Sequence, residues 1–114
     1  MIYELRIYHM HPGLQKAICD RFQNHTLSIF PRHGIKVTDF WVDGEGAERI
    51  YYVCAFESAE AKERAWASFR EDPEWIRAKQ ESEASGPIVE SVESYTMRRA
   101  PFFGMLMKRD EFFF

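Results

Sequence analysis

Hydrophobic and polar residues alternate along four stretches of the chain, which is the pattern of strands whose two faces meet different surroundings. The alternation, together with β-branched and aromatic residues, predicts strands over residues 2–10, 35–43, 49–57 and 88–98. Pro12 and Gly13 form a turn that ends the first strand, and Gly44-Glu45-Gly46 marks a hairpin between the second and the third.

The segment after the first strand changes to a helical period, in which apolar positions recur every three or four residues. The pattern predicts a helix over about residues 14–30, with one stripe made of Leu14, Ile18, Phe22, His25 and Ile29. Pro31 lacks an N–H and its ring clashes with the preceding turn, so the helix should kink or restart there. Gly34 suits a left-handed C-cap, with His33 placed favourably at the negative end of the helix.

Two helix-start signals follow the third strand. Ser58 is an N-cap residue before a helix expected over about residues 59–70. Asp72-Pro73-Glu74 repeats the signal, with a cap, a proline at the first helical position and an acidic first turn. A third helix should therefore run to about Glu83.

The resulting order is β-α-β-β-α-β, the split βαβ arrangement of ferredoxin-like α+β domains with a four-stranded antiparallel sheet. Both helices would cover one face of the sheet, and a second copy, related by a two-fold axis, would bury the other face. We expect one domain over residues 1–103, without internal repeats, followed by a C-terminal tail over 104–114.

Composition narrows the classes of function. A net charge of −3 and a pI near 5.8 argue against nucleic-acid binding. No run approaches the length of a membrane span and no secretory signal is visible. Cys19 and Cys54 lack metal or redox spacing and are expected to be buried, reduced thiols of a cytoplasmic protein. Aromatic residues make up 16% of the chain, which predicts either a pocket or a subunit interface.

Several short motifs occur in an order that resembles the NIPSNAP family. They are Tyr3-Glu4-Leu5-Arg6-Ile7-Tyr8, His25, Arg32-His33-Gly34-Ile35, Phe40-Trp41, Asp72-Pro73-Glu74-Trp75 and Arg99-Ala100-Pro101-Phe102. The resemblance extends to about residue 103 and implies a dimeric α/β barrel, in which the sheets of two subunits face each other. It brings no established catalytic set. By fold analogy, the wider group includes cofactor-free monooxygenases, isomerases and haem-handling enzymes, with a site between the sheet and the helices.

The first strand carries Glu4, Arg6 and Tyr8 on one face and apolar residues on the other. In an isolated sheet the polar face would be a solvated surface with a weak ion pair. In a two-sheet barrel it would instead be covered by the other subunit, as a pocket floor or an interface contact. Arg6 is the natural anchor for a carboxylate or carbonyl group, because its planar fork binds such groups through two hydrogen bonds.

The histidines allow several interpretations. His25 lies on the apolar stripe and is either a hydrogen-bonded core residue or part of a pocket wall, able to act as an acid or base. His33 fits a capping role. His9 and His11 have no cysteine or carboxylate at ligand spacing, so neither a metal nor haem is expected.

Aromatic and acidic residues on the middle strands are further candidates. Val37, Asp39 and Trp41 share one face of the second strand by alternation, and Asp39 between apolar neighbours is unusual. On the third strand, Tyr52 aligns with Cys54. We interpret Trp41, Tyr52 and Cys54 as cavity-lining residues, with simple core packing as the alternative.

The leading functional hypothesis is a homodimer that binds a small aromatic or polar organic molecule, with no cofactor, in a cavity between sheet and helices. The candidate ligand-binding residues are Glu4, Arg6, Tyr8, His25, Trp41 and Tyr52. One alternative is a cofactor-free monooxygenase or isomerase, in which His25 or Asp39 is the base and Arg6 steadies an oxyanion. Another is a protein-interaction module that uses the Phe-rich tail. Nucleophilic catalysis has little support, since no GxSxG elbow is present.

Overall fold

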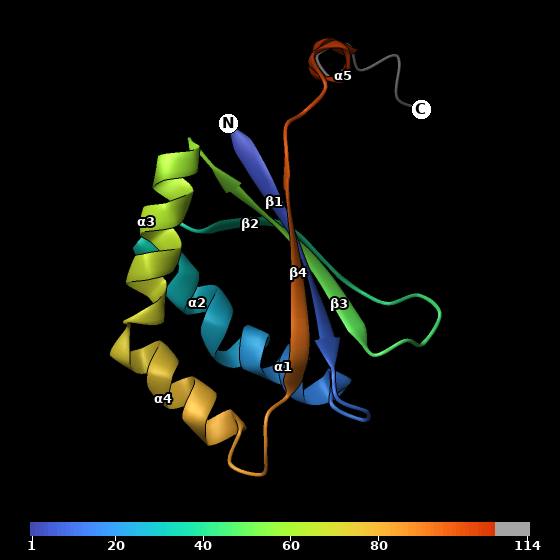
Figure 1. Ribbon diagram of the computed structural model, residues 1–114, viewed down its shortest axis with the longest axis vertical. Helices are drawn as coiled ribbons and strands as arrows, with labels where there is room; N and C mark the ends of the chain where they lie inside the picture. Colours follow the sequence, from blue (N-terminus) through green and yellow to red (C-terminus); the bar gives the residue numbers. More distant parts are fainter. Residues whose placement is uncertain (107–114) are drawn as a thin grey trace.

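The computed structural model describes residues 1–106, with side chains to residue 103 (Figure 1). Its strands are β1 (Ile2–Met10), β2 (Lys36–Val42), β3 (Arg49–Phe56) and β4 (Val89–Met97). Its α-helices are α1 (Gln15–Arg21), α2 (Leu27–Ile29), α3 (Ala59–Arg70), α4 (Pro73–Ser82) and α5 (Pro101–Leu106). Residues 107–114, most of the predicted tail, lie outside the described residues.

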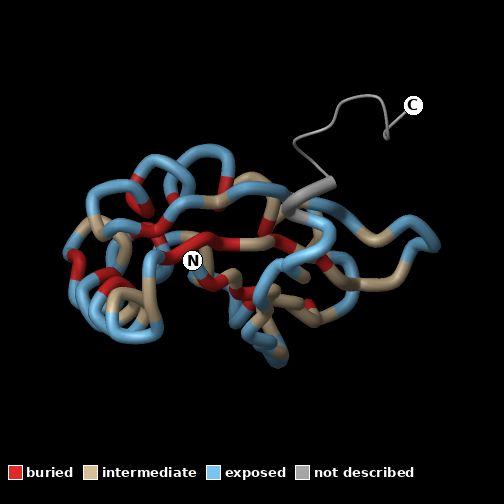
Figure 2. The backbone as a smooth tube through the Cα atoms, turned by 90° about the horizontal axis from the view of Figure 1, so that it is seen from above, coloured by how far each residue is buried: buried red, intermediate tan, exposed pale blue. Residues whose placement is uncertain are grey.

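The strands form one antiparallel sheet in the order β2-β3-β1-β4, and the helices α1 to α4 cover one face (Figure 1). This confirms the predicted ferredoxin-like α+β fold. β1 lies between β3 and β4, so Arg6 pairs with Tyr52 on one side and with Ser94 on the other. Seen from above, the buried positions follow the central strands and the helix sides that face them (Figure 2). No helix in the described part of the chain is both long and apolar enough to span a membrane.

Local capping chemistry fixes the helix ends where the sequence predicted them. The Ser58 hydroxyl accepts the N–H of Ala61 at 3.1 Å and begins α3. The Asp72 carboxylate accepts the N–H of Glu74 at 2.8 Å and begins α4. Gly34 ends the first helical segment at φ 76°, in the left-handed region that glycine adopts without strain.

The first helical segment departs from the predicted stripe. A π-helical turn, Phe22–Thr26, separates α1 from α2, and a 3-10 turn, Phe30–His33, follows. The wider π turn rotates the residues that follow it about the helix axis. Thr26, only 2% exposed, therefore faces the core, and His25 is exposed. The prediction that His25 lies on the buried stripe is wrong for this reason.

Aromatic rings fill the space between the sheet and the helices. Phe22 packs against Phe40 and Tyr52 with ring centroids 4.9 and 5.1 Å apart, and Phe30 packs against Phe69 at 4.9 Å. Tyr52 and Phe30 are almost fully buried. Much of the aromatic surplus therefore forms a packed core, in which offset and edge-to-face pairs add to the hydrophobic burial.

The polar face of β1 is covered by helices of the same chain, whereas the sequence pattern predicted that a second subunit would cover it. Glu4, Arg6 and Tyr8 face the chain's own helices, because they share a face with buried residues of β3 such as Tyr52. The interpretation that a second subunit covers this polar face is therefore wrong. The open face carries the alternate residues of β1, including Leu5, which are only partly buried.

A β-bulge in β2 alters the predicted side-chain pattern there. The register shifts between Val37 and Asp39, so Val37 pairs with Cys54 on the helix-covered face and Asp39 pairs with Val53 on the open face. The extra residue of the bulge breaks the alternation. Val37 therefore does not share a face with Asp39 and Trp41, as the alternation had predicted.

Candidate functional site

A buried carboxylate is the centre of the polar cluster on the covered face of the sheet. Glu4 is 2% exposed, and its oxygens accept three hydrogen bonds. The donors are the Ser94 hydroxyl at 2.6 Å, the indole Nε1 of Trp66 at 2.7 Å and Nη1 of Arg6 at 3.0 Å. Because β1, α3 and β4 each supply a donor, the Glu4 carboxylate connects three elements.

Arg6 is held in one position by several neighbours. Its Nε donates to the Tyr52 hydroxyl at 2.8 Å, and its guanidinium carbon lies 4.4 Å from the centre of the Trp66 ring. The Tyr8 ring lies 5.6 Å away, and the Tyr8 and Tyr52 hydroxyls are 2.9 Å apart. The side chain nevertheless remains 20% exposed, so Arg6 is not fully shielded from solvent.

The cluster keeps its charges at neutral pH. Burial would raise the pKa of Glu4, but the hydrogen bonds from Ser94, Trp66 and Arg6 outweigh it and hold the pKa below its usual value. Burial likewise opposes the charge on Arg6, yet the oxygens of Tyr52, Tyr8 and Glu4 raise its pKa above the ordinary range. Burial raises the pKa of Tyr52 well above 10. The site therefore contains one buried ion pair and a neutral phenol.

The cluster reaches solvent at the margin between α3 and β4. The helices cover β1 and β3 but not the edge strand β4 (Figure 1). The residues of β4 that point to the helix side are therefore exposed, namely Val92, Ser94 and Thr96. Lys62 of α3 donates to the Thr96 hydroxyl at 3.2 Å across this margin. A ligand could approach the exposed part of Arg6 from here.

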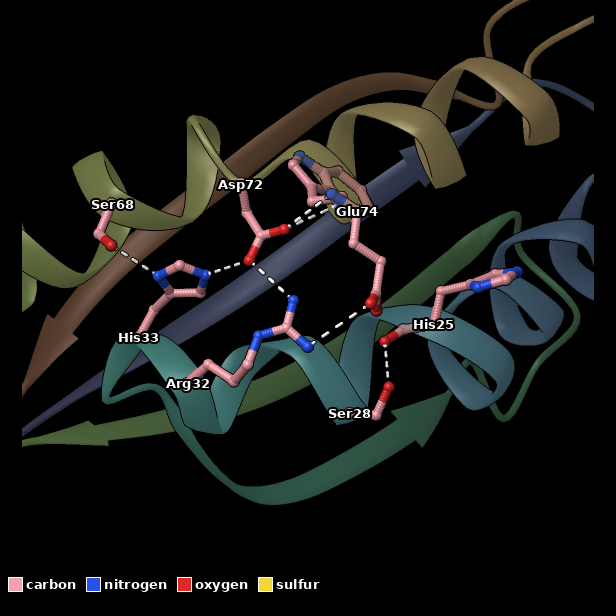
Figure 3. Close-up of polar contacts among 8 residues, drawn as sticks. His25, Ser28, Arg32, His33, Ser68, Asp72 and Glu74 are labelled. Carbon is pink, nitrogen blue, oxygen red and sulfur yellow. Dashed lines mark hydrogen bonds and ion pairs between the residues drawn. The ribbon is translucent and has the colours of Figure 1, made fainter.

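The structure brings together four of the six predicted ligand-binding residues, namely Glu4, Arg6, Tyr8 and Tyr52. Trp41 lies on the opposite face of the sheet and is 50% exposed. Asp39, one of the two candidate bases, is exposed on that same opposite face. His25, proposed for both roles, is exposed, with its ring turned away from the neighbouring polar residues in Figure 3.

Sequence reasoning missed two members of the cluster, Trp66 and Ser94. They are 62 and 90 residues from Glu4 along the chain, so no local motif connects them.

Burial raises the pKa of the neighbouring Cys54 thiol to about 12, which leaves it protonated and a poor nucleophile. In the described part of the chain, no three His, Cys, Asp or Glu residues are grouped so as to hold a metal ion.

A second polar cluster joins the 3-10 turn to α3 and α4 (Figure 3). Asp72 accepts hydrogen bonds from Nη2 of Arg32 at 2.9 Å and from Nε2 of His33 at 2.6 Å. The other ring nitrogen of His33, Nδ1, lies 2.6 Å from the Ser68 hydroxyl. Instead of only capping its own helix, His33 bridges two others and is largely buried.

An open groove of about 650 Å³ adjoins this second cluster. His33, Ser68, Lys36 and Arg64 are among its lining residues. Three further open grooves lie along the 3-10 turn, on the open sheet face and beside α4. Arg6 lines none of the four, since aromatic side chains fill the space between the sheet and the helices around it.

Solved structures with the same fold include two NIPSNAP proteins. An uncharacterised NIPSNAP domain protein from Burkholderia xenovorans is 18% identical, with a TM-score of 0.77 over 90% of this chain and 97% of that chain. A NIPSNAP family protein from Agrobacterium tumefaciens is 17% identical, with a TM-score of 0.78 over 89% and 94%.

A more distant structure, an antibiotic biosynthesis monooxygenase, is 10% identical, with a TM-score of 0.58 over 89% of this chain and 100% of that chain. These likenesses show that the chain shares the fold of these proteins. The search of curated proteins finds no match. The NIPSNAP family model matches residues 3–103, and the chain therefore belongs to the NIPSNAP family.

Proposed function

We propose that this protein is a homodimeric ligand-binding domain that holds a small, planar, polar organic molecule beside Arg6. The observation that carries the proposal is that Arg6 is charged, fixed by Glu4, Tyr52 and Trp66, and still partly exposed. A preorganised guanidinium loses little side-chain entropy when it binds a ligand.

The charges of the cluster suggest the class of ligand. Glu4 neutralises Arg6, so a carbonyl or a single carboxylate fits better than a multiply charged anion. The Arg6 guanidinium carbon lies 4.4, 5.6 and 6.0 Å from the centres of the Trp66, Tyr8 and Tyr52 rings, so a ligand that reaches its exposed edge would meet aromatic surroundings that suit a flat molecule. Aromatic carboxylates and enols combine these features.

The open face of the sheet supports the homodimer. It carries Trp41 and Tyr95, each 50% exposed, beside partly exposed aliphatic residues such as Leu5 and Val53. An apolar sheet face of this kind is most simply buried against a second copy through a two-fold axis.

The enzymatic alternative would need a base beside Arg6. Asp39 lies on the other face of the sheet and His25 is exposed on the helical side, so neither candidate accompanies the proposed oxyanion anchor. Glu4 already accepts three hydrogen bonds. These positions favour binding over catalysis at Arg6.

Thermal shift with a panel of aromatic carboxylates and enols tests the proposal. A ligand at ten times its Kd should stabilise the folded protein by about 1.4 kcal/mol, which raises Tm by several degrees. Arg6→Lys keeps the positive charge but removes the planar fork, so it should abolish most of that shift. Arg77→Ala, at an exposed position of α4, is the matched control and should retain it. An equal shift for wild type and Arg6→Lys would contradict the proposal.

A further inference from the structure

Ser68, His33 and Asp72 form a continuous chain of hydrogen bonds at the 650 Å³ groove (Figure 3). We propose that Ser68 is the nucleophile of a hydrolytic site for small carboxylic esters that carry a negative charge. The site is separate from Arg6, and the inference does not rest on ligand binding there. A hydroxyl, an imidazole and a carboxylate in series are the arrangement that activates a serine.

The hydrogen-bond order fixes the role of each group. The Arg32 guanidinium, together with His33, holds the pKa of Asp72 well below its usual range, so the carboxylate is ionised and can only accept. Nε2 of His33 must therefore donate to Asp72. In the neutral imidazole, Nδ1 then has a free lone pair, and the Ser68 hydroxyl donates to it across 2.6 Å.

The imidazole and the carboxylate are both held in place. Asp72 is fixed by the N–H of Glu74 at 2.8 Å and by Arg32 at 2.9 Å. The His33 ring packs edge-on against Phe69, with centroids 6.0 Å apart. Asp72 is accordingly a positioning residue, which orients the imidazole and stabilises its protonated form.

The groove suggests the class of substrate. Lys36 and Arg64 line it, and neither makes a hydrogen bond or ion pair with the other described residues. Arg64 precedes Ser68 by one helical turn on α3 and so lies on the same side of the helix. These cations can attract an anionic ester and stabilise the oxyanion that forms at its carbonyl. Ala61 and Ala65 add an apolar lining for the acyl chain.

The reaction needs only the ester and water. Ser68 Oγ attacks the ester carbonyl carbon and transfers its proton to Nδ1 of His33. The C–O bond to the alcohol then breaks, and the alcohol leaves with that proton. Water then attacks the acyl-serine and gives one proton to Nδ1 of His33. The C–Oγ bond breaks, the carboxylic acid is released, and His33 returns the proton to Oγ, which restores the serine.

Covalent labelling with a fluorophosphonate gives a readout that does not depend on the natural substrate. Ser68 Oγ would form a bond to phosphorus, fluoride would leave, and His33 would take the hydroxyl proton. Mass spectrometry of wild type should show one adduct, mapped to Ser68. His33→Gln should slow the labelling by about 100-fold or more, because it removes the base. His25→Gln, an exposed histidine of the same helical segment, is the matched control and should label as wild type does.

Hydrolysis of the mono-4-nitrophenyl ester of succinate provides the second measurement. Ser68→Ala should reduce kcat/KM above background by about 100-fold or more, whereas Ser28→Ala should leave it unchanged. Arg64→Met should lower kcat/KM for this ester more than for neutral 4-nitrophenyl butyrate. Melting temperatures establish that each variant is folded. The absence of an adduct at Ser68 in folded wild type, or equal labelling rates in wild type and His33→Gln, would overturn the proposal.

Discussion

Replacing Arg6 with methionine removes the guanidinium while keeping an unbranched side chain over the Trp66 ring. The change leaves the Glu4 carboxylate, which is 2% exposed, with hydrogen bonds from Ser94 and Trp66 but without its countercharge. A buried charge without its partner is strongly destabilising, even where the intact pair contributes little net stability.

The structure predicts the size of the effect. Breaking a buried ion pair from one side costs about 3–5 kcal/mol, which lowers Tm by roughly 10–20 °C for a domain of this size. In a Glu4→Gln background no charge is stranded, so Arg6→Met should cost less there. The coupling between the two positions should be on the order of 1–3 kcal/mol.

Urea unfolding of wild type, both single variants and the double variant measures this coupling as a double-mutant cycle. Lys16→Met is a suitable control, because Lys16 and Asp20 form an ion pair on the exposed surface of α1. That pair should be worth less than about 1 kcal/mol. A similarly small cost for Arg6→Met, or a cost independent of Glu4, would refute the buried-pair interpretation.

Three further predictions concern pH, the π turn and the dimer. Because folding lowers the pKa of Glu4 from 4.5, the contribution of Glu4 to stability is present above pH 4.5 and is lost as the pH falls below it. Urea unfolding at pH 3–7 should therefore show a smaller loss of unfolding free energy at low pH for Glu4→Gln than for wild type. His25→Ala should change the free energy of unfolding by less than about 0.5 kcal/mol, whereas Thr26→Ala should cost about 1 kcal/mol or more; the reverse order would contradict the rotation by the π turn. In analytical ultracentrifugation, Trp41→Ser should weaken dimerisation, whereas Val42→Ser, on the other face of the same strand, should not; equal effects would argue against the open face as the interface.

The sequence predicts those parts of the fold that depend on local chemistry. Ser58 and Asp72 each begin a helix through a side-chain bond to a backbone N–H two or three residues away, so the signal and its effect lie together. Alternation likewise places Glu4, Arg6 and Tyr8 on one face of β1.

The features that the sequence did not predict depend on single-residue insertions or distant contacts. One extra residue in the π turn moves His25 out of the core, and one in the β2 bulge separates Val37 from Asp39. Both faces of β1 carry aromatic residues, so the pattern does not reveal which face the helices cover. The bridge made by His33 is equally hidden, because its partners lie 35 and 39 residues away.

A crystal structure of the protein with the compound that gives the largest thermal shift tests the central claim most directly. We predict density for that compound within hydrogen-bond distance of the Arg6 guanidinium, at the margin between α3 and β4, in a dimer joined by the open sheet faces. Density confined to another groove, with Arg6 contacting only Glu4, Tyr52 and Trp66, would contradict the account.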